Sequence, residues 1–126
     1  MAKTVIQTSN APEAVGAYSQ AVSANGLVFC SGQIALTPDG SDKTTESVAD
    51  QTRQCLTNLQ AVLAEAGTSL DNAVKVTAFL TDMADFVEFN EVYAEFFTGD
   101  VPARATVGVA ALPKGARVEV ECIALA

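Results

Sequence analysis

Two stretches near the end of the chain decide the fold. Residues 101–109 read VPARATVGV, and residues 117–124 read RVEVECIA. In the second stretch apolar and charged residues alternate with the period of a β-strand, so Val118, Val120 and Cys122 share one face. The small and β-branched residues of the first stretch also favour a strand. We therefore expect two strands that form a final hairpin through residues 112–115.

The same alternation predicts which side chains face the protein interior. Val107 and Val109 share one face of their strand, and we expect that face, like the apolar face of the last strand, to pack on helices. Arg104 and Thr106 would then lie on the opposite, open face of the sheet. That open face would also carry charged residues of the last strand, namely Arg117, Glu119 and Glu121.

Local signals earlier in the chain predict the remaining elements. Asn25-Gly26 lies between two short apolar runs, which is the strongest short hairpin signal. Ser47 with Asp50 three residues later is a variant capping box, and Gly67 closes the helix that begins there. Asp82 precedes a second helix that ends at Gly99. The expected strands are residues 5–6, 21–23, 27–30, 73–80, 103–110 and 117–124, with helices at 47–67 and 82–99.

These elements give the order β-β-β-α-β-α-β-β in a single domain of residues 1–126. Two helices can cover one face of one mixed sheet, so the predicted class is a two-layer α+β domain. The open face would be partly charged and partly apolar, because residues 27–30 and 73–80 are apolar on both faces. Such a face is an improbable monomer surface, and self-association through it is the simplest remedy.

Composition and charge exclude several functions. The chain is 49% hydrophobic and 17% charged, which fits a compact globular protein. No apolar run reaches the length of a membrane helix, and the N-terminus lacks the apolar core of a secretory signal. We therefore expect a cytoplasmic protein without a membrane partner. A net charge of −8 argues against nucleic acid as a partner, because such binding draws on Lys and Arg.

Histidine is absent from the 126 residues, which excludes Ser-His and Cys-His nucleophilic catalysis and disfavours a transition-metal site. The three cysteines, Cys30, Cys55 and Cys122, are widely spaced and form no C-x-x-C pair, which argues against a zinc site or a disulfide framework. All three lie in apolar patterns typical of small buried side chains. We expect chemistry without a metal or cofactor, carried by carboxylates, arginine, hydroxyls, backbone groups and water.

Two interpretations of Arg104 remain open at this point. It can form a structural salt bridge with Glu119 or Glu121 across the final hairpin, or its planar fork can bind the carboxylate of a ligand. In the expected hairpin register Glu121 is the nearer partner, and Glu119 is offset from Arg104 by about 13–15 Å along the strands. If Arg104 and Glu119 cooperate, a subunit boundary or a bound ligand must bring them together.

An ordered set of short motifs resembles the reactive intermediate deaminase A (RidA, or YjgF-like) family from about residue 4 to residue 124. Each fragment is weakly specific, but the set is strong. The motifs are Gly16-Ala17-Tyr18, Ser31-Gly32-Gln33, Asn90, Pro102-Ala103-Arg104, Leu112-Pro113 and Val118-Glu119-Val120-Glu121.

The resemblance implies a chorismate-mutase-like fold and a homotrimer whose sheets form a central barrel, with sites in the clefts between subunits. It also implies hydrolysis of short-lived enamines and imines to 2-keto acids and ammonia. The implied substrates are small molecules such as 2-aminoacrylate, 2-iminopropanoate and 2-iminobutanoate, by-products of pyridoxal-phosphate enzymes.

The resemblance carries over to individual residues as well. Arg104 matches the arginine that binds the substrate carboxylate, and Glu119 matches the glutamate that positions or activates water. The cleft-lining positions match Tyr18, Ser31, Gly32 and Asn90.

Two positions depart from the family pattern. Thr106 stands where cysteine is frequent, and Ala17 replaces the common proline. Because water can attack an imine carbon without a covalent intermediate, we expect Thr106 to narrow or shift substrate preference rather than abolish activity. The rival hypotheses are a regulatory trimer that binds small carboxylates at Arg104 without catalysis, and a chaperone-like or translation-related role.

Overall fold

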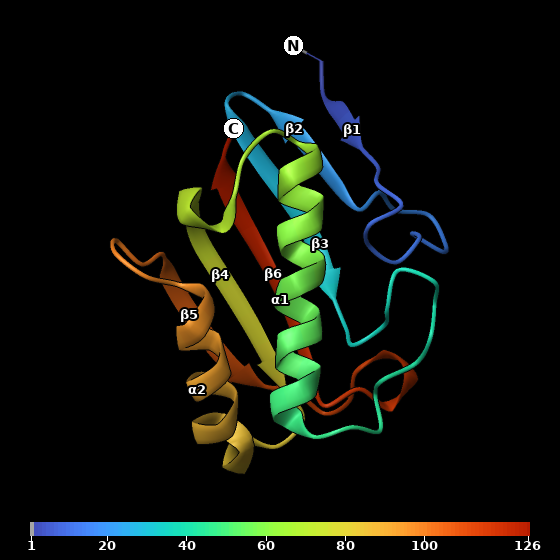
Figure 1. The fold of residues 1–126 in the computed structure, drawn as a ribbon, viewed down its shortest axis with the longest axis vertical. Helices are drawn as coiled ribbons and strands as arrows, with labels where there is room; N and C mark the ends of the chain where they lie inside the picture. The colour runs from blue at the N-terminus through green and yellow to red at the C-terminus, as the bar shows by residue number, and fades with distance from the viewer. Residues whose placement is uncertain (1) are drawn as a thin grey trace.

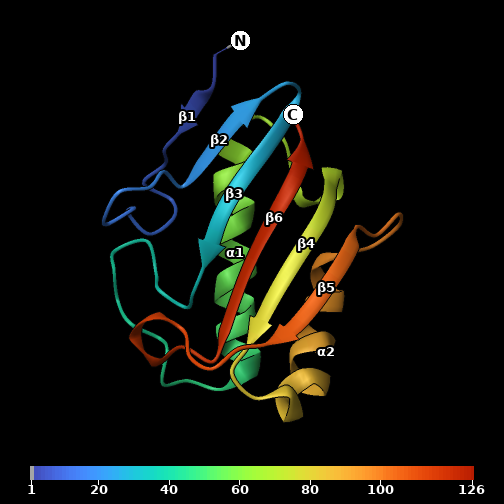
Figure 2. The same cartoon turned by 180° about the vertical axis from the view of Figure 1, so that it is seen from behind.

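The computed structural model describes residues 2–126, which form one six-stranded sheet with two helices packed on one face (Figures 1 and 2). The spatial order of the strands is β1-β2-β3-β6-β4-β5. The strands are β1 (Thr4–Ile6), β2 (Ala21–Ala24), β3 (Leu27–Gln33), β4 (Ala73–Leu80), β5 (Ala103–Gly108) and β6 (Val118–Leu125), and the helices are α1 (Val48–Glu65) and α2 (Phe86–Phe96).

The predicted α+β class, with one mixed sheet and two helices on one side, is confirmed. All neighbouring strands are antiparallel except β4 and β5, which run parallel. Three short 3-10 helices are added to the predicted elements, η1 (Leu70–Asn72), η2 (Met83–Asp85) and η3 (Pro113–Gly115). Seen from behind, the strands carry no helix over them, so the second face of the sheet is uncovered (Figure 2).

The predicted turns and caps are present. Asn25 and Gly26 adopt φ values of 51° and 77°, the left-handed pair that a tight hairpin between β2 and β3 requires. The Ser47 hydroxyl accepts a hydrogen bond from the Asp50 backbone N–H at 3.1 Å, which caps α1. A second acceptor at this end comes from α2, because the Glu88 carboxylate accepts from the backbone N–H of Ala49 at 2.8 Å.

The expected hairpin of the last two strands is wrong. β6 pairs with β3 and β4, whereas β5 pairs only with β4. β4 therefore lies between β5 and β6 (Figure 2). The reason is the α2 crossover, which returns the chain parallel to β4 at the edge of the sheet. The backbone N–H of Val109 still bonds to the Leu80 carbonyl at 2.9 Å, and the chain then crosses to the sheet centre before β6 begins.

The expected faces of β5 are also wrong. Arg104 and Thr106 are registered beside Val76 and Ala78, two fully buried residues of β4, and therefore point to the helix side. Val107 points to the uncovered face and is 39% exposed. Apart from Arg104, the residues of β5 are apolar or small on both faces, so alternation alone could not assign its sides. For β6 the prediction is confirmed, since Val118 and Val120 are fully buried against the helices.

The core lies between the sheet and α1, and the cysteines belong to it. Cys30 and Cys122 lie opposite each other on β3 and β6, and Cys55 projects from α1; all three thiols are free and buried. Burial raises the pKa of Cys55, and hydrogen bonding to Cys30 together with burial raises the pKa of Cys122. The cysteines therefore act as small core side chains, as expected.

None of the helices described for residues 2–126 has the length and apolar character needed to span a bilayer.

Candidate functional site

Four of the predicted site residues line one cavity of about 570 Å³, which we call the Glu119 cavity. Tyr18 approaches it from the N-terminal loop, Ser31 and Gly32 from β3, and Glu119 from β6. Its other walls are largely apolar and come from the segment before β2, from the end of β3 and the segment after it, and from the segment before β6. They consist of Pro12, Glu13, Val15, Gln20, Gln33, Ile34, Leu36, Pro113 and Lys114.

Glu119 lies on the uncovered face of β6 and is half-buried. Among residues 2–126 no hydrogen bond or ion pair engages its carboxylate. Burial raises the pKa of this carboxyl, and the like charge of Glu121 two residues away raises it further. A half-buried, unpaired carboxylate at a cavity wall is available to hold water or accept a proton.

Gly32 allows β3 to approach Glu119 closely. A Cβ added at position 32 would lie 2.8 Å from Cδ of Glu119 and would also collide with Oε2. The backbone of Gly32 lies outside the left-handed region, so the need for glycine here comes from space and not from backbone conformation. The absence of a side chain at Gly32 therefore leaves the space that the Glu119 carboxylate occupies.

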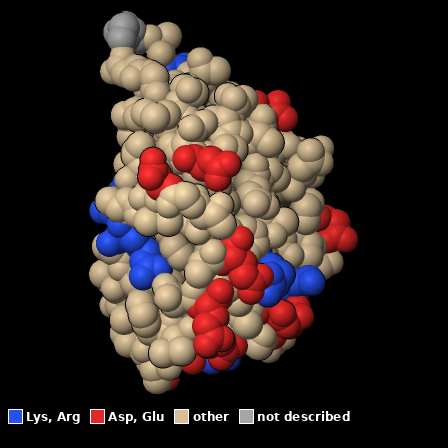
Figure 3. All heavy atoms as spheres, turned by 60° about the vertical axis from the view of Figure 1, so that its left-hand side comes forward, with Lys and Arg blue, Asp and Glu red and all other residues tan. Residues whose placement is uncertain are grey.

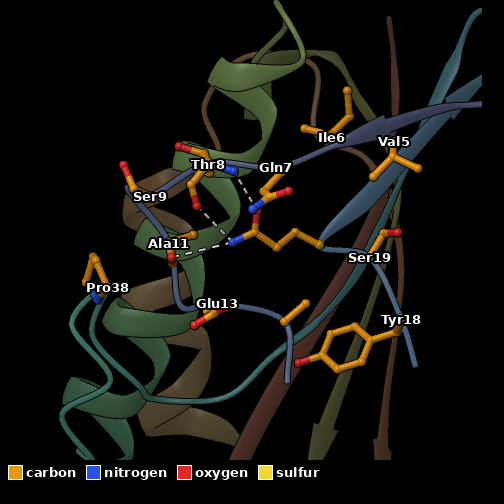
Figure 4. A pocket seen from close by; sticks show the side chains of 12 residues that line it. Val5, Ile6, Gln7, Thr8, Ser9, Ala11, Glu13, Tyr18, Ser19 and Pro38 are labelled. Atoms are coloured by element: carbon orange, nitrogen blue, oxygen red, sulfur yellow. Dashed lines mark hydrogen bonds between the residues drawn. The ribbon is translucent and has the colours of Figure 1, made fainter. Parts of the chain in front are cut away.

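The loop that carries Tyr18 is held by a buried glutamine that the sequence analysis missed. The Gln20 side-chain carbonyl accepts from the Thr8 N–H at 2.7 Å, and its amide donates to the carbonyls of Thr8 and Pro12 at 3.1 and 2.8 Å. Dashed lines in Figure 4 mark hydrogen bonds of this set, in a cavity of about 400 Å³ that Tyr18 also borders. The only sequence signal for a role of Gln20 is its position two residues after Tyr18.

Tyr18 and Ser31 occupy different environments beside that loop. The Tyr18 side chain is 53% exposed and borders both cavities. The Ser31 hydroxyl donates to the Ser19 carbonyl at 2.6 Å, and the Ser31 N–H donates to the Gln20 carbonyl at 2.9 Å. Ser31 thus ties β3 to the loop, and its hydroxyl keeps its acceptor lone pairs.

The other three predicted residues lie together on β5 and α2. Nη1 of Arg104 donates to Oδ1 of Asn90 at 2.7 Å, and the guanidinium carbon lies 4.6 Å from the ring centre of Tyr93. A second ring, that of Phe86, is 5.6 Å away. Oγ1 of Thr106 is buried and has no hydrogen-bond partner among the described residues. We call Arg104, Asn90, Thr106, Tyr93 and Phe86 the Arg104 cluster.

The salt-bridge interpretation of Arg104 is wrong for the single chain. Among residues 2–126 Arg104 forms no ion pair, and Glu121 is registered opposite Thr77 instead. The guanidinium is exposed, and its one hydrogen bond within the described chain is to Asn90. Its remaining donors are therefore free to bind an anion.

One chain does not bring Arg104 and Glu119 together. Arg104 is aligned with Cys122 through Val76, so Glu119 lies three residues further along β6 and two strands away. Strand geometry then places the two Cα atoms about 14 Å apart. The side chains also leave opposite faces of the sheet, one on the helix side and one on the uncovered side.

Acidic residues of α2 and of η2, which precedes it, form ion pairs with basic residues of other elements. Glu95 pairs with Arg53 of α1 at 2.8 Å, and Asp85 pairs with Arg117 before β6 at 3.0 Å. Figure 3 shows acidic side chains gathered on this side of the molecule, with basic groups beside them. The carboxylates of Glu95 and Asp85 are thus engaged in ion pairs within the chain.

Fold and site together define a small α+β protein with a free arginine and a free carboxylate on opposite faces of one sheet. The family model for endoribonuclease L-PSP matches residues 8–126. The chain therefore belongs to this family. Relatives of the chain also carry names that refer to reactive intermediate deaminase A or to the Rid family.

Individual relatives are similar over nearly the whole chain. The 2-iminobutanoate/2-iminopropanoate deaminase of Rattus norvegicus is 46% identical over 123 residues, covering 98% of this chain and 90% of its own length. Reactive Intermediate Deaminase A, chloroplastic, of Arabidopsis thaliana is 48% identical over 97% of this chain, which spans 65% of that protein. The crystal structure of a protein from Entamoeba histolytica described as a putative endoribonuclease L-PSP has a TM-score of 0.95 and 53% identity, covering 99% of this chain and 100% of its own.

Proposed function

We propose that the protein hydrolyses enamine and imine derivatives of small 2-amino acids to 2-keto acids and ammonia. One observation carries this proposal: Arg104 is exposed, oriented by Asn90 and unpaired, and Glu119 is half-buried, unpaired and beside a cavity. An arginine fork suits a substrate carboxylate, and a carboxylate of raised pKa suits proton transfer. The name of the rat relative, an iminobutanoate and iminopropanoate deaminase, supports the same chemistry.

The active unit we propose is a homotrimer in which two chains complete each site. One subunit supplies Arg104, Asn90 and Thr106, and its neighbour supplies the residues of the Glu119 cavity. Support comes from the uncovered sheet face, where Phe29 is 43% exposed and Leu125 50% exposed. Burying these side chains against a second copy would stabilise the assembly.

In the proposed reaction Arg104 binds the substrate carboxylate through its free donors, which fixes the orientation of the neighbouring C=N carbon. An enamine first takes a proton on carbon and becomes the protonated imine. Glu119 hydrogen-bonds a water and accepts a proton from it as the water oxygen adds to that carbon, while the C=N electron pair moves to nitrogen and a carbinolamine forms. Glu119 then returns the proton to nitrogen. The C–N bond breaks, ammonia leaves, and the hydroxyl proton passes to solvent as the carbon becomes the ketone of the 2-keto acid.

The remaining residues shape the site in this proposal. Tyr18 closes the cavity over the substrate, and Gly32 gives Glu119 the space to hold its position. Ser31 offers acceptor lone pairs to the imine N–H. Thr106 contributes a small side chain to the site beside Arg104 and adjusts which substrate side chain is preferred.

The direct test generates 2-iminopropanoate in situ with an amino-acid oxidase and traps it with semicarbazide. The proposal predicts that the wild-type protein lowers semicarbazone formation from the imine and releases pyruvate faster. A protein that diverts none of the imine but binds 2-keto acids would be the regulatory trimer instead. The family is described as an endoribonuclease family. The net charge of −8 offers no support for that activity, because binding of RNA draws on Lys and Arg.

Substituting Gly32 by alanine should lower kcat about 10- to 100-fold, because the new methyl group displaces the Glu119 carboxylate from its water. The melting temperature should change little, since the Glu119 side chain can rotate away. Steady-state kinetics of Gly32→Ala, Glu119→Ala and the double variant test this. Additive losses in the double variant would show that Gly32 does not act through Glu119.

The pH dependence should report the raised pKa of Glu119. A general base acts in its ionised form, so kcat/KM should fall as the pH drops through that pKa. The Glu121→Gln variant removes a like charge, lowers the Glu119 pKa and should move the acid limb to lower pH, with the plateau unchanged. A limb that stays in place or moves to higher pH contradicts the assignment.

A further inference from the structure

We propose that Tyr93, assisted by Phe86, is the positioning residue that holds the Arg104 guanidinium ready for the substrate carboxylate. The inference rests on the proposed function, since it specifies how one half of that site is organised.

The guanidinium has two kinds of support. Asn90 holds it at one edge through the 2.7 Å hydrogen bond, and the ring of Tyr93 lies 4.6 Å from its central carbon. Phe86 provides a second ring at 5.6 Å. Three residues of one helix, spaced about one turn apart, therefore hold the charged end of an exposed side chain that would otherwise sample many rotamers.

Tyr93 is itself rigid. Its side chain is 6% exposed, and its ring stacks on Phe97 with centres 4.4 Å apart and an angle of 25° between planes. This stacked pair moves little, so it transfers its fixed position to the guanidinium. Phe89 is not part of the stack, because its ring is tilted by 39° from that of Tyr93 with centres 5.5 Å apart.

We assign this support to the ring of Tyr93. Oη of Tyr93 is buried, and no described residue forms a hydrogen bond of good geometry with it. Burial raises the pKa of Tyr93, and the charge and hydrogen-bonding capacity of nearby Arg104 oppose that rise in part. The phenol is therefore neutral at physiological pH and attracts the cation through its ring. The free guanidinium donors are left to the ligand.

The test compares Tyr93→Leu, Tyr93→Phe and Phe89→Leu. The last is a matched control, because Phe89 belongs to the same aromatic group, is fully buried and has no cation–ring contact with Arg104. Two quantities are measured: KM and kcat in the imine assay, and the Kd of pyruvate by calorimetry. Circular dichroism and thermal unfolding test whether each variant is folded. If Tyr93→Leu does not fold, Phe86→Leu replaces it in the comparison.

We expect Tyr93→Leu to raise KM and the pyruvate Kd about three- to tenfold, with kcat within twofold of wild type. Tyr93→Phe should stay within twofold throughout, and Phe89→Leu should lower the melting temperature without changing KM. Equal KM effects of Tyr93→Leu and Phe89→Leu would overturn the inference. So would equal losses for Tyr93→Phe and Tyr93→Leu, which would assign the effect to the hydroxyl.

The two proposals fail in different ways. If the wild type diverts no imine, the deaminase proposal fails, but pyruvate affinity still tests Tyr93. If Arg104→Ala weakens pyruvate binding and Tyr93→Leu leaves it unchanged, only the positioning role fails.

Discussion

The Arg104→Ala variant is expected to lower kcat/KM for 2-iminopropanoate by at least about 10²-fold. The guanidinium supplies charge-assisted hydrogen bonds to the carboxylate, and losing it removes both affinity and the orientation of the C=N carbon. Folding should be unaffected, since the side chain is exposed and its hydrogen bond to Asn90 lies at the surface. The imine diversion assay and the Kd of pyruvate measure the two contributions separately.

Two further variants sharpen this experiment. Arg104→Lys keeps the charge but loses the planar fork, so it should recover only part of the activity. Arg53→Ala is the matched control, because Arg53 pairs with Glu95 on the exposed surface of the helices and should leave kinetics unchanged. Wild-type rates in Arg104→Ala would remove the basis of the proposed function.

The Glu119→Gln variant should lower kcat about 10²- to 10⁴-fold, the usual contribution of a general acid–base group. Glutamine keeps the shape of the side chain but cannot accept the proton from water. The melting temperature should stay the same or rise, because burial and the neighbouring Glu121 both disfavour the charged form of Glu119.

Glu121→Gln is the appropriate comparison for that variant. It removes a carboxylate from the same face of the same strand, two residues away, and should retain the plateau value of kcat. If Glu119→Gln keeps more than about a tenth of wild-type kcat, water activation must be assigned to another group.

Much of the fold could be predicted because its signals are local. The Asn25-Gly26 turn needs a left-handed backbone, and the structure places both residues there. The Ser47 cap and the alternation along β6 likewise depend on residues close in sequence. The candidate site could be named only through an ordered set of motifs, and how those residues act together remains a proposal.

The errors concern β5. Its small residues suit either face and either neighbour, so proximity in the chain favoured a hairpin with β6. The structure instead pairs β5 with β4, because α2 returns the chain in the parallel direction. This one change moves Arg104 from the open face to the helix side and brings it to Asn90 and Tyr93.

The elements, the turns and the α+β class follow from local patterns in the chain, because hydrogen bonding and burial along one strand or helix depend on residues a few positions apart. That Arg104 and Glu119 leave opposite faces of the sheet, and that the guanidinium lies beside the Tyr93 ring, is visible only in three dimensions. Those facts depend on which strands become neighbours, a choice made by packing between segments far apart in the chain.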